Sequence, residues 1–205
     1  MTTTLFTNAH IATGEPGSTA ASTLPLQDIL VTDGVFTAFG PGLAQQYEAQ
    51  GGDLAAIEVV DLGGKLVCPP FCDTHLHLDY VFTARKPGAV NESGTLFEGI
   101  QRWSETKSDL TVDEIKQRAK IGIKKEMLHG VQLIRSHADV TDPNLTSLKA
   151  LLELKEELKD TVTLQIVSFP QEGMYSYESP HGESGAELVE EGLKMGADCV
   201  GGIPH

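Results

Sequence analysis

Short apolar runs alternate with stretches of helical periodicity from residue 67 onward. In NLTSLKALLELKEELKDT, Leu145, Leu148 and Leu152 recur at helical spacing while Lys and Glu fall mainly on other faces, which predicts a helix with a solvated charged side and i,i+4 ion pairs. The apolar runs predict four strands, at residues 71–77, 132–138, 163–169 and 198–203. Because strands that alternate with helices pair in parallel through right-handed crossovers, we expect an α/β fold, either a doubly wound sheet or a (β/α)8 barrel.

Local signals mark the helix boundaries in this region. Three S/T-x-x-E patterns predict capping boxes, at Thr95/Glu98, Thr111/Glu114 and Ser184/Glu187. Asp142 and Pro143 are expected to open another helix, with Asp as N-cap and Pro at the first helical position. Gly130 and Gly196 stand where helices would close before the next strand.

Residues 1–66 show a different pattern, with short strand-like runs separated by turns. Asp33-Gly34 between two apolar runs predicts a hairpin, since a type I′ turn needs positive φ at its centre. The segment TGEPGSTAASTLP predicts an exposed loop, and GPG at residues 40–42 predicts a turn. We therefore expect a small β domain at residues 1–66 and a βα series at residues 67–205.

Composition excludes several partner classes. The 205 residues carry 15 Lys and Arg against 29 Asp and Glu, and the net charge of −14 produces a field that repels phosphate backbones and anionic lipid. We therefore expect no nucleic-acid and no membrane partner. The three cysteines are odd in number, and the N-terminal sequence lacks a basic region followed by an apolar run, so we expect a cytoplasmic chain with reduced thiols.

The stretch PPFCDTHLHLDY, residues 69–80, carries the candidate chemistry. Residues i and i+2 of a strand point to the same face, so His75 and His77 direct two imidazoles at one point. They also close the first strand of the series, and in both candidate folds chemistry gathers at the carboxyl ends of strands. Since neutral imidazole is the commonest metal ligand in proteins, the pair predicts part of a zinc or iron site.

Other readings of this stretch stay open. One histidine could be a hydrogen-bonded core residue and the other a surface residue. A structural site of Cys68, Cys72 and His75 is disfavoured because Cys72 faces away from the histidines, and both cysteines are expected to be buried, small apolar residues. The sequence contains no P-C-x-x-C, no G-x-S-x-G and no P-loop. These absences argue against a zinc deaminase of the P-C-x-x-C type, a serine hydrolase with a nucleophile elbow and a P-loop nucleotide-binding protein.

Five segments together resemble the cytosine deaminases of the amidohydrolase superfamily: VCPPFCDTHLHLDY, SGTLFEGIQRW, HADVTDPNLTSLKALLELKEEL, LQIVSFPQEG and GADCVGGIPH. The likeness runs from about Val60 to the last residue, with a looser match in the N-terminal β domain. Many metal amidohydrolases share the H-x-H strand, whereas SGTLFEGI and FPQEG are typical of the cytosine deaminase branch. Triazine and isocytosine hydrolases share much of the pattern.

The resemblance implies a fold and a site. The fold is a (β/α)8 barrel with a small β-sandwich assembled from both ends of the chain, so this sequence would be the first half of the barrel preceded by part of the sandwich. One divalent metal ion, iron or zinc, is expected, with His75 and His77 as ligands. Gln171 resembles the substrate-binding glutamine, and its amide can pair with a pyrimidine edge, although a water-exposed loop glutamine is the plain alternative. His137 and Asp139 are interpreted as scaffold residues that support the site.

The same resemblance shows what the sequence lacks. A barrel needs about 250 residues, and residues 67–205 supply four of its eight strands. The third metal-binding histidine, the proton-transferring glutamate and later ligands are expected beyond residue 205, so no catalytic residue is assigned within this chain and the chain alone is expected to be inactive. We expect the barrel to be completed by the missing C-terminal half or within a homo-oligomer.

A completed barrel is expected to deaminate a small heterocyclic substrate of pyrimidine type, cytosine to uracil and ammonia. The alternative within the same class is an amidohydrolase acting on a triazine or isocytosine ring. The alternative from another class is a non-catalytic amidohydrolase fragment or assembly partner.

Overall fold

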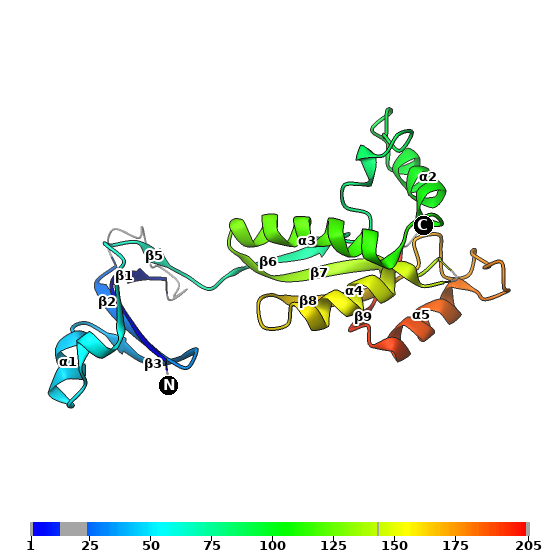
Figure 1. Ribbon diagram of the computed structural model, residues 1–205. Coiled ribbons are helices and arrows are strands. Elements are labelled where there is room, and N and C mark those ends of the chain that lie inside the picture. Colours follow the sequence, from blue (N-terminus) through cyan, green and yellow to red (C-terminus); the bar gives the residue numbers. More distant parts are fainter. Residues whose placement is uncertain (1, 13–23, 143, 204–205) are drawn as a thin grey trace. The chain divides into compact units, whose positions relative to one another are not determined.

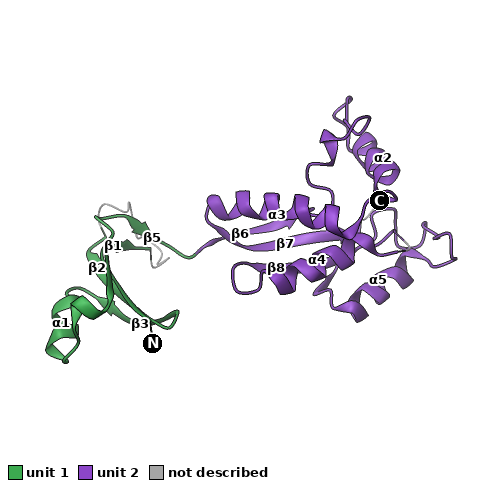
Figure 2. Ribbon diagram, in the orientation of Figure 1, with its two compact units in different colours: residues 1–69 green, residues 70–205 purple. Residues whose placement is uncertain are grey.

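The computed structural model divides the chain into an N-terminal unit, residues 1–69, and a C-terminal unit, residues 70–205 (Figures 1 and 2). The described residues are 2–12, 24–142 and 144–203. Most of the predicted loop at residues 13–25, and Pro143 at the predicted helix start, lie outside them.

The N-terminal unit is built on one five-stranded sheet. Its strands are β1 (Thr3–Ile11), β2 (Leu26–Thr32), β3 (Val35–Gly40), β4 (Glu58–Asp61) and β5 (Leu66–Val67). The order is β3-β2-β1-β4 with β5 also beside β1; β1, β2 and β3 are antiparallel, whereas β4 and β5 run parallel to β1. Asp33 and Gly34 join β2 to β3 with φ of 49° and 79°, which confirms the predicted hairpin and its positive-φ centre.

A helix that the sequence did not predict belongs to this unit. After the turn at residues 40–42, α1 (Leu43–Ala49) and the short 3-10 helix η2 (Leu54–Ala56) lead to β4. The buried carboxylate of Asp28 on β2 accepts the backbone N–H groups of Asn8 and Leu43 at 3.1 and 2.9 Å, so it ties β1 to the start of α1. Leu43 is the buried residue of α1, and this short apolar face explains why periodicity did not reveal the helix.

The C-terminal unit is a parallel sheet with the order β6-β7-β8-β9. Its strands are β6 (Phe71–Leu76), β7 (Val131–Asp139), β8 (Thr163–Phe169) and β9 (Cys199–Val200). Its helices are α2 (Leu96–Lys107), α3 (Val112–Leu128), α4 (Thr146–Glu157) and α5 (Gly185–Met195), with a 3-10 helix η3 (Thr83–Arg85) before α2. All four predicted strands are confirmed, although β9 is much shorter than expected.

The capping signals are confirmed in different degrees. Ser184 and Glu187 form the full reciprocal box at α5. Thr95 and Thr111 accept the expected N–H groups at α2 and α3, but the Glu98 carboxylate accepts from the backbone of residues 92 and 93 instead of from its own N-cap. These S/T-x-x-E patterns therefore located the helix starts correctly.

The predicted start of α4 is wrong. The helix begins at Thr146, and its N-cap Leu145 has a left-handed φ of 51°. Asp142 lies upstream and its carboxylate accepts the N–H groups of Asn144 and Thr146 at 3.0 and 2.8 Å. The Asp142 carboxylate thus accepts a free backbone N–H group at the helix N-terminus, although Asp142 lies four residues before the first helical residue.

Helices α3 and α4 contribute much of the core of this unit. Ile115, Ala119 and Ile123 of α3 are buried, as are the α4 leucines Leu148, Leu151 and Leu154. On the sheet side the core includes Ile134, Leu164 and Ile166. Leu152, which the sequence placed on the apolar stripe with Leu145 and Leu148, is half-buried and packs on the edge of the core.

Leu151→Ala is expected to lower the free energy of unfolding of the chain by about 2 to 5 kcal/mol, because the substitution leaves a cavity under a fully buried side chain. Chemical denaturation followed by circular dichroism measures this loss. Leu152→Ala, next to it on the same helix and only half-buried, is the matched control and should cost clearly less. Equal losses for the two variants would contradict this packing.

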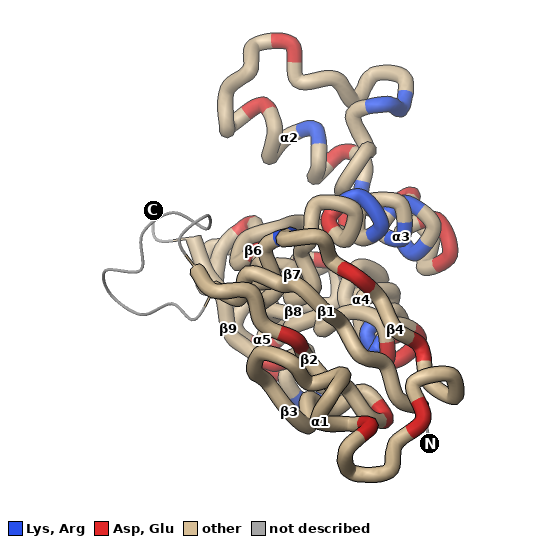
Figure 3. Tube along the Cα trace, turned by 90° about the vertical axis from the view of Figure 1, so that its left-hand side faces the viewer, with Lys and Arg blue, Asp and Glu red and all other residues tan. Residues whose placement is uncertain are grey.

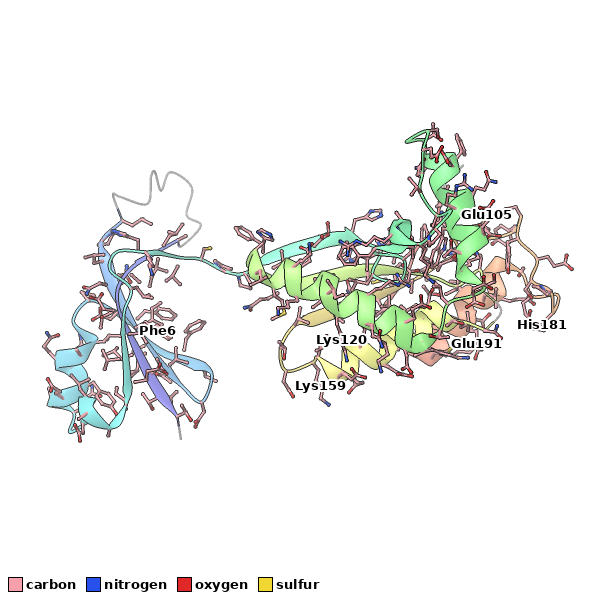
Figure 4. All side chains as sticks on the ribbon, turned by 45° about the horizontal axis from the view of Figure 1, so that its top comes forward. Phe6, Glu105, Lys120, Lys159, His181 and Glu191 are labelled. Carbon is pink, nitrogen blue, oxygen red and sulfur yellow. The ribbon has the colours of Figure 1, made fainter. Side chains whose placement is uncertain are left out.

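The charged side of α4 pairs with neighbouring elements. Lys116 of α3 bridges Glu153 and Glu157 of α4, and Lys120 also reaches Glu157. Figure 3 shows basic and acidic positions on both helices, and Figure 4 labels Lys120 on α3. In the described part of the chain, no i,i+4 pair forms within α4, so that detail of the prediction is wrong. The helical spacing is right, but the packing of α3 beside α4 offers these carboxylates closer cations.

The predicted burial of the cysteines is also wrong. Cys68 and Cys72 are exposed and Cys199 is half-buried, and all three are free. Cys72 lies on β6, an edge strand that pairs with β7 alone and whose residues are largely exposed. Within the described residues, no helix combines the length and apolar character that crossing a membrane requires.

Candidate metal centre

Three histidines meet at the carboxyl ends of the first two strands of the C-terminal sheet. His75 lies on β6, His77 directly follows it, and His137 lies on β7, the parallel neighbour of β6. Each offers one ring nitrogen, and these three nitrogens lie within 4.8 Å of one another. The ring of His75 stacks on that of His137 with centroids 4.3 Å apart, and the His77 ring centroid lies 5.4 Å from each.

The lowered pKa values of two of these histidines suit metal binding. Burial, together with the neighbouring imidazoles of His137 and His75, lowers the pKa of His77 to about 4. Burial and then the imidazole of His75 also lower the pKa of His137. The Nδ1 atoms of His77 and His137 are buried and have no hydrogen-bond partner among the described residues. Neutral rings with free nitrogens fit a divalent ion, because metal ligation requires the unprotonated lone pair.

The sequence identified two members of this cluster and gave the third another role. His75 and His77 lie together as their i,i+2 spacing predicts, and their assignment as metal ligands stays a prediction. His137 was interpreted as a scaffold residue, but the structure brings its ring into contact with both. The signal that could have found it is its place near the carboxyl end of the next parallel strand, which faces the same edge of the sheet.

A cavity opens beside the histidines. It has a volume of about 550 Å³, within the usual range for small-molecule sites. Its lining includes both histidines of the H-x-H pair, the aromatic rings of Tyr80, Trp103 and Phe169, and Gln171. The Tyr80 ring stacks on the His77 ring at 4.6 Å, and the Trp103 ring lies 4.8 Å from that of Tyr80. The cavity therefore offers flat apolar walls next to the candidate metal ligands, a shape that suits a planar ring.

Gln171 lies where a substrate-binding residue would be needed. It follows β8, lines this cavity and is only 8% exposed, so the alternative of a water-exposed loop glutamine is wrong. Its backbone N–H faces Asp139 Oδ1 at 3.4 Å. A buried amide offers two donors and an acceptor in one plane, which is the pattern that the edge of a nitrogen heterocycle can match.

Two buried carboxylates contact residues that line the cavity. Asp79 accepts the backbone N–H groups of Asp139 and Tyr80 at 2.9 and 3.1 Å, and its burial raises its pKa to about 7. Asp79 Oδ1 is 4.0 Å from His77 Nδ1, beyond hydrogen-bonding distance. The carboxylate of Asp139 accepts the indole N–H of Trp103 at 2.7 Å and the hydroxyl of Thr141 at 2.6 Å. Both carboxylates therefore hold backbone and cavity walls in place, which agrees with the supporting role interpreted for Asp139.

The segment after His77 is fixed from the outside by α3. The Arg118 guanidinium donates to the backbone carbonyls of Val81 and Asp79 at 2.7 and 3.1 Å. Both carbonyls come after the end of β6, outside the backbone hydrogen bonds that join β6 to β7. Arg118 thus orders the turn that carries Tyr80 over His77.

Comparison with known proteins gives a consistent family. The family model of the amidohydrolases matches residues 58–205. The N-isopropylammelide isopropyl amidohydrolase of Pseudomonas sp. (strain ADP) is 35% identical over 149 residues, which are 70% of this chain and 36% of that protein. The pterin deaminase of Rhizobium rhizogenes is 27% identical over 152 residues, which are 72% of this chain and 32% of that protein. The chain spans about a third of these curated relatives.

Solved structures support the same architecture. The 5-methylcytosine deaminase of Klebsiella pneumoniae, liganded with phosphonocytosine, is 40% identical with a TM-score of 0.80, over 98% of this chain and 44% of that one. The N-isopropylammelide isopropylaminohydrolase of Burkholderia multivorans has a TM-score of 0.72 at 23% identity, over 98% of this chain and 44% of that one, which indicates a shared fold. The expected fold class is confirmed: the α/β chain corresponds to the N-terminal part of a barrel of this type.

Proposed function

Because this chain belongs to the amidohydrolase family, we propose that it forms the first half of a metal-dependent hydrolase that removes an amine from a nitrogen heterocycle. Cytosine, converted to uracil and ammonia, is the first candidate substrate. The observation that carries this proposal is the convergence of His75, His77 and His137 beside a cavity that also holds the buried amide of Gln171.

Each described side chain has a defined part in this proposal. His75 and His77, with His137 beside them, would hold one divalent ion, iron or zinc. That ion supplies Lewis-acid activation of water, which hydrolysis of a ring C–N bond needs at neutral pH. Gln171 pairs with the polar edge of the ring, and the neighbouring rings of Tyr80 and Trp103 form a wall that restricts its tilt. The group that moves protons, and further ligands, belong to strands beyond residue 205.

The strands that complete the barrel are part of the proposal. In the described C-terminal sheet, β6 and β9 pair on one side each, so each offers a row of free backbone groups. We propose that a C-terminal half, or a second chain in an oligomer, pairs with these edges. In the N-terminal unit, Val35, Phe36 and Phe39 are more than half exposed, and we propose that the remainder of a β-sandwich covers them.

A second ring type is favoured by one observation. The 35% identity to a protein named for amidohydrolysis of N-isopropylammelide makes a triazine the main alternative. The 40% identity to a 5-methylcytosine deaminase favours a cytosine, with or without a 5-methyl group. We place the cytosines first, since this second likeness is higher and extends over nearly the whole chain.

The test is native mass spectrometry of the protein from its own cells, purified without chelators, followed by product analysis. We expect a species larger than this chain with one divalent ion, and ammonia release from cytosine or 5-methylcytosine ahead of isocytosine and aminotriazines. A metal-free species of this chain alone, inactive on every ring, would replace this proposal with the non-catalytic fragment or assembly partner. Preference for a triazine would support the proposed hydrolysis of a ring C–N bond, with a triazine as the substrate in place of cytosine.

A further inference from the structure

Lys107 joins three elements next to residues that line the cavity. It occupies the last turn of α2, and its ammonium lies 3.1 Å from Asp139 Oδ2, 3.0 Å from Thr141 Oγ1 and 2.5 Å from Glu172 Oε1. Asp139 and Thr141 mark the carboxyl end of β7, and Glu172 belongs to the loop after β8. The Lys107 side chain is 10% exposed, so these contacts form largely out of water, where a charge needs partners.

The same helix is attached through two further side chains close by. The indole N–H of Trp103 donates to the Asp139 carboxylate at 2.7 Å, and the Ser104 hydroxyl donates to Glu172 Oε1 at 2.7 Å. Trp103 is the buried residue of α2, whose N-terminal Leu96 and Phe97 are more than 70% exposed. Figure 1 shows α2 standing away from the layer that α3 and α4 form on the sheet. The position of this helix therefore depends on few contacts, and Lys107 makes three of them.

These contacts lie on both sides of Gln171. Its own N–H faces Asp139 Oδ1 at 3.4 Å, and the next residue, Glu172, is held by Lys107 and Ser104. Without Lys107, the carboxylates of Asp139 and Glu172 would remain close together with no cation between them. Their repulsion would separate the loop after β8 from the end of β7 and move both Gln171 and the Trp103 wall.

We propose that Lys107 is a positioning residue that locks α2 and the Gln171 loop into one rigid wall of the cavity. This inference rests on the proposed function and deepens it, since it assigns the orientation of the ring to a contact outside the cavity lining. An ion pair that only stabilised the fold would not couple the mobility of α2 to that of the Gln171 loop. Coupling between the two segments is therefore the property to measure.

The test uses the complete metal-loaded protein that contains this chain, with Lys107→Met, Lys107→Arg and, as matched control, Lys116→Met. Lys116 is likewise little exposed, at 15%, and bridges two glutamates, but it does not line the cavity beside the histidines. Hydrogen exchange with mass spectrometry follows residues 96–107 and 169–173. Steady-state kinetics on the best ring substrate, and metal content, complete the comparison.

We expect Lys107→Met to accelerate exchange in both segments and to raise KM about tenfold, with a smaller change in kcat and unchanged metal content. Lys107→Arg should bring hydrogen exchange and KM most of the way back to the wild-type values, because arginine keeps the charge and several donors. Lys116→Met should leave both segments and KM unchanged. If Lys107→Met destabilises the protein too far, Glu172→Gln, which keeps a polar partner for Ser104 and removes the charge, should show the same changes in weaker form.

Two results would overturn the inference: native exchange at residues 169–173 in Lys107→Met, or equal effects of Lys107→Met and Lys116→Met. Failure of the proposed function is a separate result. If the wild-type protein releases ammonia from no ring, the proposed function fails, while the exchange data still decide whether Lys107 couples the two segments.

Discussion

His75→Ala is expected to remove the metal and lower ring turnover by about three orders of magnitude in the complete protein, since a bound ion contributes several kcal/mol of transition-state stabilisation. His75 is exposed, so its loss leaves no cavity in the core and the fold should persist. Metal analysis after dialysis and the rate of ammonia release measure the two effects.

The control for this variant is His129→Ala. His129 is also exposed, and it caps α3 at the opposite end of β7 from the cluster. The His129→Ala variant should retain the wild-type metal content and the wild-type rate of turnover. If His75→Ala kept both as well, the metal-ligand role of the H-x-H pair would be refuted.

Gln171→Leu is expected to lower kcat/KM about a hundredfold while the metal content stays at the wild-type level. Leucine keeps the size of the side chain but has neither donor nor acceptor, so the polar ring edge would be buried without partners. The substitution should cost little stability, because the amide side chain lines a cavity instead of the packed core. Steady-state kinetics with cytosine and 5-methylcytosine, together with metal analysis, separate this effect from loss of the ion.

Gln101→Leu provides the comparison, since Gln101 is an exposed residue on α2 whose side chain bonds Glu105. It should behave as the wild type. Wild-type kcat/KM for Gln171→Leu on every ring would remove Gln171 from the substrate site, whatever the fate of the metal.

What could be predicted from the sequence were features encoded by near neighbours in the chain. The strands, the Asp33-Gly34 hairpin and three helix starts follow from spacings of four residues or fewer. The start of α4 was missed because Asp142 reaches its helix across a turn, and α1 was missed because it buries little. Cys72 was expected to be buried as a small apolar residue, but it lies on β6, an edge strand whose residues are largely exposed in this unit.

The parts of the site that spacing did not reveal depend on tertiary pairing. His75 and His77 share one strand, so period-two alternation brings them together. His137 joins them only once β6 and β7 pair in parallel, and the register of that pairing has irregularities that the sequence does not show. The contacts of Lys107 with Asp139 and Glu172 span 32 and 65 residues, and no local pattern connects them.

The small buried surface of α2 has an evolutionary consequence. This helix lines the cavity through Leu96 and Ile100, yet it buries one residue and lies outside the layer of α3 and α4. Substitutions on its cavity side therefore cost little stability, whereas changes in the sheet would disturb the core. A segment of this kind can change its cavity-facing side chains with little effect on the strand that carries His75.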